Sequence, residues 1–172
     1  MTVTVRTARR SDADAMGRIH VESWQAAYVG IVSQTHLDGL DSNQRAENWR
    51  EAISATPNPT HGRRLVAELS GEVVGIALVV PDRSGTDATG EIPILYVHPT
   101  AWGAGVGYAL LAECEAELVR RGFESGLLWV LADNERARRF YERQGWTADG
   151  GEQRDSIGGI ELTEVRYRKA LR

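Results

Sequence analysis

Three alternating glycines between a strand-like run and a helical run constrain this chain more than any other feature. Residues 95–111 read L-Y-V-H-P-T-A-W-G-A-G-V-G-Y-A-L-L. Gly103, Gly105 and Gly107 lack side chains, so a ligand can approach the backbone closely and positive φ costs little. The following residues predict an amphipathic helix over 108–119, whose unpaired N–H groups and positive dipole end would point back at the loop. The stretch therefore predicts a phosphate or pyrophosphate site.

Two common phosphate-binding motifs do not match this loop. A dinucleotide-binding G-x-G-x-x-G would need its third glycine at Tyr108, and a P-loop would need a lysine directly after Gly107. The surviving pattern is a strand, then Pro99, then G-x-G-x-G at the start of a helix. Taken alone, this pattern is equally compatible with a plain tight turn.

A second informative segment, residues 127–146, reads L-L-W-V-L-A-D-N-E-R-A-R-R-F-Y-E-R-Q-G-W. It predicts a strand and then a short helix that begins near Asn134. On that helix Asn134, Arg138 and Tyr141 share one face, while Phe140 lies on the neighbouring face and can enter the core. Gly145 suits a left-handed C-cap. Two alternatives stay open: Asn134 as a simple helix cap and Tyr141 as a packing residue.

Together the two segments resemble the GCN5-related N-acetyltransferases, the GNAT superfamily. The family writes the second segment as N-x-x-A-x-x-F-Y-x-x-x-G-F, and only the last fixed position differs, where Trp146 replaces phenylalanine. The family loop is usually Q/R-x-x-G-x-G/A, and Trp102 occupies the Gln/Arg position. The resemblance implies an α/β GNAT fold: a mostly antiparallel, twisted central sheet flanked by helices. It also implies that acetyl-CoA binds between splayed central strands at 90–97 and 126–131.

The order of the predicted elements agrees with that fold. Alternation predicts a strand at 2–9, and Ser11 then offers an N-cap for a helix at 12–27, with Asp14 completing a partial capping box. Further patterns predict a helix at 42–54, a hairpin joining 64–69 to 73–80, and a last hairpin joining 147–156 to 161–171. Because no linker or repeat divides the chain, residues 1–172 are expected to form a single GNAT N-acetyltransferase domain.

Composition argues against several other functional classes. The net charge is −4 and the pI is about 5.6, so a nucleic-acid partner is not expected. Cys114 is the only cysteine and the four histidines lack ligand spacing, so neither an internal disulfide nor a metal site is expected. No apolar run approaches the roughly eighteen residues of a membrane span and the N-terminus lacks a signal-peptide core, which predicts a cytoplasmic protein with no membrane partner.

The resemblance implies how the cofactor is held. Leu95, Tyr96 and Val97 would lie on a bulged strand whose outward backbone groups pair with pantetheine, and the Val97 amide would polarise the thioester carbonyl. Asn134 would hold the pantetheine arm or the cofactor helix, and Arg138 would meet the adenosine phosphates. The pyrophosphate would bind the amides of Trp102, Gly103, Ala104, Gly105, Val106, Gly107 and Tyr108.

Acetyl transfer to an amine also needs a base and an acid. Tyr141 holds the position of the family's usual acid and would protonate or hydrogen-bond the departing thiolate. Glu91 lies eleven residues before Trp102, the offset of the catalytic glutamate in histone-type members of the superfamily. Glu91 can equally be a solvated strand-end charge, in which case a water chain would serve as base. Glu22 and Asp133 are lesser candidates.

Aromatic residues in the first two predicted helices indicate where the acceptor binds, because that region covers the acceptor side in the family. Trp24 and Tyr28 could receive the stem of an amine or an antibiotic, although helix packing is the alternative and is favoured for Trp49.

The predicted function is transfer of the acetyl group of acetyl-CoA to a primary amine of a small molecule, by direct attack in a ternary complex. An acyl-CoA-binding module or sensor without turnover, and a protein N-terminal or lysine acetyltransferase, are the alternatives. A homodimer formed through the last hairpin is a further expectation.

Overall fold

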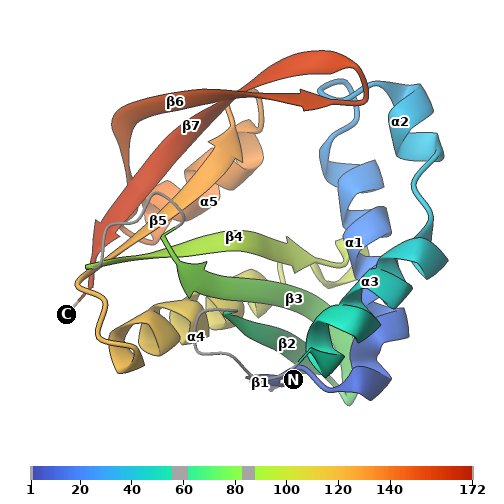
Figure 1. Ribbon diagram of the computed structural model, residues 1–172, viewed down its shortest axis with the longest axis horizontal. Helices are drawn as coiled ribbons and strands as arrows, with labels where there is room; N and C mark the ends of the chain where they lie inside the picture. The colour runs from blue at the N-terminus through green and yellow to red at the C-terminus, as the bar shows by residue number, and fades with distance from the viewer. Residues whose placement is uncertain (1, 56–61, 83–87, 172) are drawn as a thin grey trace.

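The computed structural model describes residues 2–55, 62–82 and 88–171, and Figure 1 shows them as a twisted sheet with helices on both sides. Seven strands lie in the order β1-β2-β3-β4-β5-β7-β6. Each neighbouring pair is antiparallel except β4 and β5, which run parallel. The predicted mixed α/β architecture with a mostly antiparallel central sheet is confirmed.

The elements have the following bounds. The strands are β1 Val3–Thr7, β2 Arg63–Leu69, β3 Glu72–Pro81, β4 Thr89–Val97, β5 Ser125–Leu131, β6 Thr147–Ile157 and β7 Ile160–Ala170. The helices are α1 Ala13–Ala27, α2 Gln34–Asp38, α3 Ser42–Ser54, α4 Val106–Arg120 and α5 Glu135–Arg143, with 3-10 turns at Arg10–Asp12 and Pro99–Ala101. Both predicted hairpins and the helix at 42–54 are confirmed. The sequence did not predict α2, because a helix of five residues is too short to show a helical periodicity.

The start of α1 differs from the prediction. Ser11 lies inside a 3-10 turn and does not cap the helix. Asp12 instead accepts a hydrogen bond from the Arg9 backbone N–H at 2.7 Å, and its carboxylate pairs with Arg6 of β1 at 2.7 Å. Asp14 turns outward to pair with Arg50 of α3. The predicted capping box was wrong because an ion pair to the sheet fixes this helix end.

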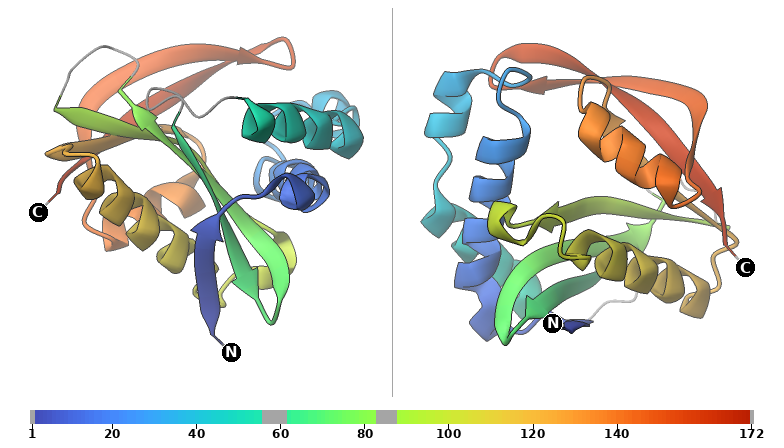
Figure 2. Two further views of the ribbon diagram at one scale, coloured as in Figure 1. Left: turned by 60° about the horizontal axis from the view of Figure 1, so that its bottom comes forward. Right: turned by 180° about the vertical axis from the view of Figure 1, so that it is seen from behind.

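Two helix layers cover the two faces of the sheet. Figure 2 shows α1 and α3 against one face, with α4 and α5 against the other. On the α4 side, the residues most deeply buried in the core include Leu110, Leu111, Cys114, Leu118, Leu128 and Trp146. On the α1 side, the buried core residues are Ala8, Ala13, Met16, Ile19, Trp49, Val66 and Ile76. Within the described ranges, no helix is long and apolar enough to cross a membrane.

The sheet opens between its two central strands. β4 pairs with β5 only at Thr89, Gly90 and Glu91. A register shift against β3, between Leu78 and Val80, marks a bulge in the part of β4 that follows Glu91. Pro93 stands in this part of β4 and has no N–H to donate to a neighbouring strand. Beyond Glu91 the two strands therefore part, as the predicted splay requires.

A half-buried histidine ties α1 to the sheet. The His20 ring lies between Tyr96 of β4, at 5.1 Å between ring centroids, and Trp49 of α3, at 6.2 Å. Within the described residues, its buried Nδ1 has no hydrogen-bond partner. Burial and the nearby Arg45 charge lower the pKa of His20 to about 4, so the ring is neutral at pH 7.

This environment predicts acid sensitivity. Between pH 6.5 and 4 the unfolded chain protonates His20 and the folded chain does not, so the free energy of unfolding should fall by up to about 3 kcal/mol as pH drops through this window. The His20→Phe variant keeps the ring packing and removes the titration. Urea unfolding at a series of pH values should show a shallower pH slope for the variant; equal slopes would contradict this account.

Candidate active site

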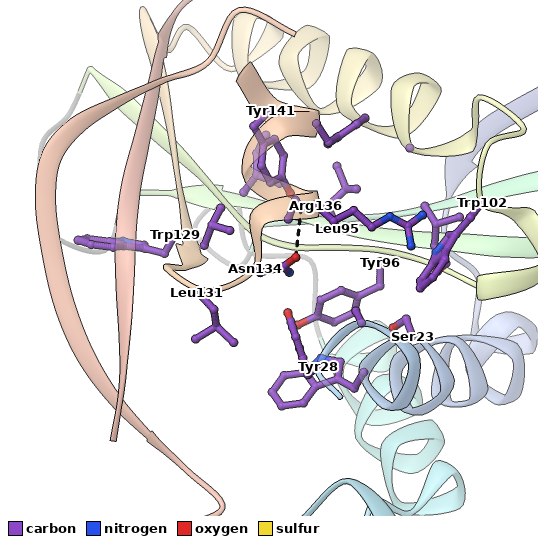
Figure 3. Close-up of a pocket in the computed structure, with 18 of the residues that line it drawn as sticks. Ser23, Tyr28, Leu95, Tyr96, Trp102, Trp129, Leu131, Asn134, Arg136 and Tyr141 are labelled. Atoms are coloured by element: carbon purple, nitrogen blue, oxygen red, sulfur yellow. Dashed lines mark hydrogen bonds between the residues drawn. The ribbon is translucent and has the colours of Figure 1, made fainter. Parts of the chain in front are cut away.

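A cavity of about 550 Å³ occupies the gap where β4 and β5 part. Figure 3 shows that its walls come from β4, β5, the end of α1, the glycine loop and α5. The β6–β7 hairpin closes one end. The sequence-predicted site residues that line it are Trp24, Tyr28, Leu95, Tyr96, Val97, Trp102, Gly103, Gly105, Val106, Gly107, Tyr108, Asn134 and Tyr141. Three predicted site residues do not line it: Glu91, Ala104 and Arg138.

The glycine loop presents free amides to this cavity. Gly103 and Gly105 have φ of +79° and +81°, which explains why glycine is needed at both positions. Gly105 is the N-cap of α4, and having no side chain it leaves the N–H groups of the first turn uncovered. The first intrahelical bond runs from the Ala109 N–H to the Gly105 carbonyl. The amides of Val106 and Gly107 therefore remain available to an anion at the positive end of a fifteen-residue helix.

Gly107 differs from the other two glycines. It lies in the first turn of α4 and does not have a positive φ. A Cβ there would stand 3.4 Å from the Phe140 ring of α5, which is an ordinary van der Waals distance. The start of α4 and α5 therefore lie close together here, but this approach does not require glycine.

The edge of β4 offers backbone groups that are not paired with a neighbouring strand. The His98 N–H donates to the Val74 carbonyl of β3 at 2.8 Å. In an antiparallel pair hydrogen-bonded and non-bonded positions alternate, so the N–H and carbonyl of Val97 point away from β3, towards the cavity. Leu95 shares this orientation. Because β5 has already separated, no strand covers these groups.

Trp102 fills the position where the family usually carries Gln or Arg, and the structure gives it a bracing role. Its indole N–H donates to the Val97 carbonyl at 2.8 Å, which ties the glycine loop to β4. The Arg136 guanidinium of α5 lies over the Trp102 ring, 3.4 Å from its centroid. Figure 3 shows this arginine reaching across the cavity towards the loop.

Arg136 is a positively charged cavity-lining residue that the sequence did not single out. Within the described part of the chain it has no carboxylate partner, so its charge is available to a ligand. Arg138, which was predicted instead, donates from Nε to the Tyr167 hydroxyl at 3.1 Å and from Nη1 to the Ala132 carbonyl at 3.0 Å. Helical spacing counted from Asn134 selected Arg138, but Asn134 is the N-cap. The cavity-facing side of α5 is the one that carries Arg136, Phe140 and Tyr141.

Three tyrosines face the cavity as neutral hydrogen-bond donors. Burial raises the pKa of Tyr28, Tyr96 and Tyr141 above its ordinary value. Tyr141 is 9% exposed, and its hydroxyl makes no hydrogen bond to any described residue. Asn134 accepts a hydrogen bond from the Ala137 N–H at 3.1 Å, so it caps α5 while also lining the cavity.

Glu91 lies inside the sheet, not at a solvated strand end. It is 2% exposed and is in register with Val80 on one side and Leu127 on the other. The alternative that it is a solvated edge charge is therefore wrong. Its neighbours Ile92 and Pro93 line the cavity, which places Glu91 just behind the wall.

The acceptor-side aromatics separate into two groups. Trp24 and Tyr28 pack edge to face at 4.9 Å and line the cavity. Trp49 is buried in the α1 side of the core, so the packing interpretation of this residue is confirmed. Across the described ranges, no three His, Cys, Asp or Glu side chains are arranged to hold a metal ion.

The bracing role of Trp102 is testable by substitution. Trp102→Phe keeps the face under Arg136 but leaves the Val97 carbonyl without its indole donor, which should cost about 1 kcal/mol of folding stability. A double-mutant cycle of Trp102→Leu and Arg136→Ala reports on the contact between the guanidinium and the indole ring. The coupling energy between the two substitutions should be about 0.5 to 1 kcal/mol. Urea unfolding measures both, and a coupling energy of zero would contradict the contact.

Comparison with known proteins agrees with this geometry. The uncharacterized N-acetyltransferase YuaI of Bacillus subtilis (strain 168) is 29% identical, covering 95% of this chain and 90% of YuaI. A putative acetyltransferase from Salmonella typhimurium, solved with its cofactor acetyl-CoA, is 25% identical, with a TM-score of 0.72 over 100% of this chain and 95% of that one. The PaiA N-acetyltransferase of Thermoplasma acidophilum, solved with coenzyme A, shares the fold at 19% identity, with a TM-score of 0.74 over 99% of each chain. Residues 19–146 match the acetyltransferase (GNAT) family, and the chain belongs to that family.

Proposed function

We propose that this protein transfers the acetyl group of acetyl-CoA to a primary amine of a small molecule, by direct attack in a ternary complex. One observation carries the proposal: the free amides of the α4 N-terminus and the free edge of β4 line the same cavity. The first can hold a pyrophosphate and the second an extended pantetheine arm.

The residues present suit coenzyme A. Gly103 and Gly105 leave open space where a Cβ would otherwise stand, so phosphate oxygens can reach the backbone. Arg136 adds an unpaired positive charge to the same end of the cavity. The volume of about 550 Å³ is within the range of small-molecule sites.

Acetyl-CoA supplies an acetyl group activated as a thioester. The Val97 N–H would donate to the carbonyl oxygen as negative charge develops there, and losing one such donor typically costs about 3 kcal/mol. Tyr141 would donate its hydroxyl hydrogen bond to the leaving sulfur. Because burial raises the pKa of Tyr141 further above that of a thiol, hydrogen-bond donation is favoured over complete proton transfer.

In the proposed reaction the amine loses its proton through water. Glu91 lies behind the cavity wall and does not line it, so we propose that any role for this carboxylate as base is exerted through a water chain. Glu91→Gln would then change the pH dependence of kcat/KM and leave coenzyme A affinity unchanged.

We also propose a cytoplasmic protein that forms a homodimer. The exposed β6 is the last strand of the sheet and leaves an open edge for a second copy. Light scattering measures the oligomeric state directly.

The proposed function has a direct test. Coenzyme A should raise the melting temperature in a dose-dependent way, and an amine panel with acetyl-CoA should release free thiol for at least one amine. Binding of coenzyme A without acetylation of any amine would support the alternative that the protein is a sensor. Absence of coenzyme A binding would overturn both the enzyme and the sensor proposals.

Arg136 and Arg138 make a matched pair for substitution, because both are arginines on α5. Arg136→Gln should weaken coenzyme A binding about tenfold, because a charge facing the phosphates is lost. Arg138→Gln should lower folding stability, since its bonds to Tyr167 and Ala132 are lost, while affinity stays close to wild type. Calorimetric titration compares the two, and the reverse order would restore the sequence-based assignment of Arg138.

Tyr141→Phe tests the proposed acid. The variant should bind coenzyme A like the wild type, because the ring and its packing remain, while kcat falls about a hundredfold. Steady-state kinetics with a saturating amine measures this. An unchanged kcat would assign Tyr141 to packing alone.

A further inference from the structure

The cavity is charged differently at its two ends. The glycine loop, the start of α4 and Arg136 make one end positive. At the opposite end Asp155 of β6 and Glu164 of β7 line the cavity. The positive end suits the phosphates of the proposed cofactor, so the acidic end is left for the acceptor.

The two carboxylates lie on one face of the hairpin. Asp155 is in register with Leu162, and Glu164 is in register with Gln153. Directly paired residues share a face of the hairpin. Asp155 and Glu164 are therefore diagonal neighbours, whose positions on the two strands lie roughly 7–8 Å apart. Leu162 and Ile157 of the same face pack against Leu131 and the end of α1, so this face looks into the cavity.

These carboxylates lack cationic partners among the described residues. Asp155 makes no ion pair there, and Glu164 accepts a hydrogen bond only from the neutral Gln153 amide, at 2.6 Å. Arg166, on the same strand as Glu164, is already bonded to Asp149 at 2.8 Å and does not line the cavity. Two negative charges therefore face a space walled by Trp24, Tyr28 and Trp129.

Two charges so close together are poorly suited to the reacting nitrogen itself. That nitrogen must be neutral to attack, and two adjacent carboxylates would raise its pKa and hold it protonated. They suit a second ammonium group that stays charged throughout the reaction. The aromatic walls between the two ends suit the methylene chain. Trp24 and Tyr28 can also face a cation, whereas Trp129 already has the Arg166 guanidinium 5.6 Å from its ring centroid.

We propose that the acceptor is a diamine or polyamine, whose distal ammonium group is held by Asp155 and Glu164; this inference rests on the proposed function. Acetyl transfer forms the C–N bond of an amide on the near nitrogen and breaks the C–S bond of the thioester. The proton lost by the attacking amine passes through water to the departing thiolate, which leaves as coenzyme A thiol. The far ammonium group keeps its proton and its charge throughout.

The test compares 1,5-diaminopentane with 5-amino-1-pentanol, which replaces one ammonium by a hydroxyl at equal length. At low ionic strength KM should be about tenfold lower for the diamine, and added salt should narrow the difference. Asp155→Asn combined with Glu164→Gln should remove the preference and leave the amino alcohol and coenzyme A affinities unchanged. Glu161→Gln is the matched control, because it removes one charge from the opposite face of the same hairpin.

Calorimetric binding of 1,5-diaminopentane to the coenzyme A complex gives a readout without turnover. Tighter binding by the wild type than by the double variant supports the proposal. The proposal is overturned if the wild type has equal KM values, or equal affinities, for the diamine and the amino alcohol. It is also overturned if the preference for the diamine survives in the double variant. Acetylation of amines without this preference would overturn the diamine inference alone, whereas absence of coenzyme A binding would overturn the proposed function.

Discussion

The early end of the β4–β5 pairing is the feature on which the site depends. Two central strands of a sheet normally satisfy each other's backbone groups along their whole length. Here they do so at three positions and then part, after Glu91 and around Pro93. The separation leaves the Val97 N–H without a strand partner in the middle of the sheet and opens the cavity. A ligand that pairs with this edge completes the sheet.

The neighbouring elements hold that opening in shape. Trp102 ties the glycine loop to the Val97 carbonyl, and Phe140 of α5 lies close to Gly107 at the start of α4. The His20 ring fixes α1 against Tyr96 on the opposite side. These contacts join the walls of the cavity to β4 or to one another, so packing within the protein defines the shape of the cavity.

Charge is distributed along the cavity in the order that the proposed reaction requires. Positive groups cluster where phosphates would lie, neutral tyrosines line the middle, and carboxylates stand at the hairpin end. The neutral middle matters because a nucleophilic amine has to lose its proton there. A uniformly acidic cavity would hold the amine protonated, and a uniformly basic one would repel it.

Local patterns predicted much of this structure, and long-range contacts account for what they missed. The glycine loop, α3 and both hairpins follow from periodicity and turn residues within a few positions. Arg136 could not be chosen over Arg138, because that choice depends on which face of α5 meets Trp102, thirty-four residues earlier in the chain. The placement of Asp12 likewise depends on Arg6 in another element. Asp155 and Glu164 read as ordinary hairpin charges until the register puts them on one face.

The claim that the glycine loop binds the pyrophosphate is tested most directly by comparing coenzyme A with pantetheine, which lacks the nucleotide and its phosphates. Calorimetry should show that the wild type binds coenzyme A far more tightly. In Gly105→Val, where a β-branched residue cannot hold the required φ of +81°, the two ligands should bind with similar, weak affinity. A variant that kept the full preference for coenzyme A would contradict the assignment of the loop.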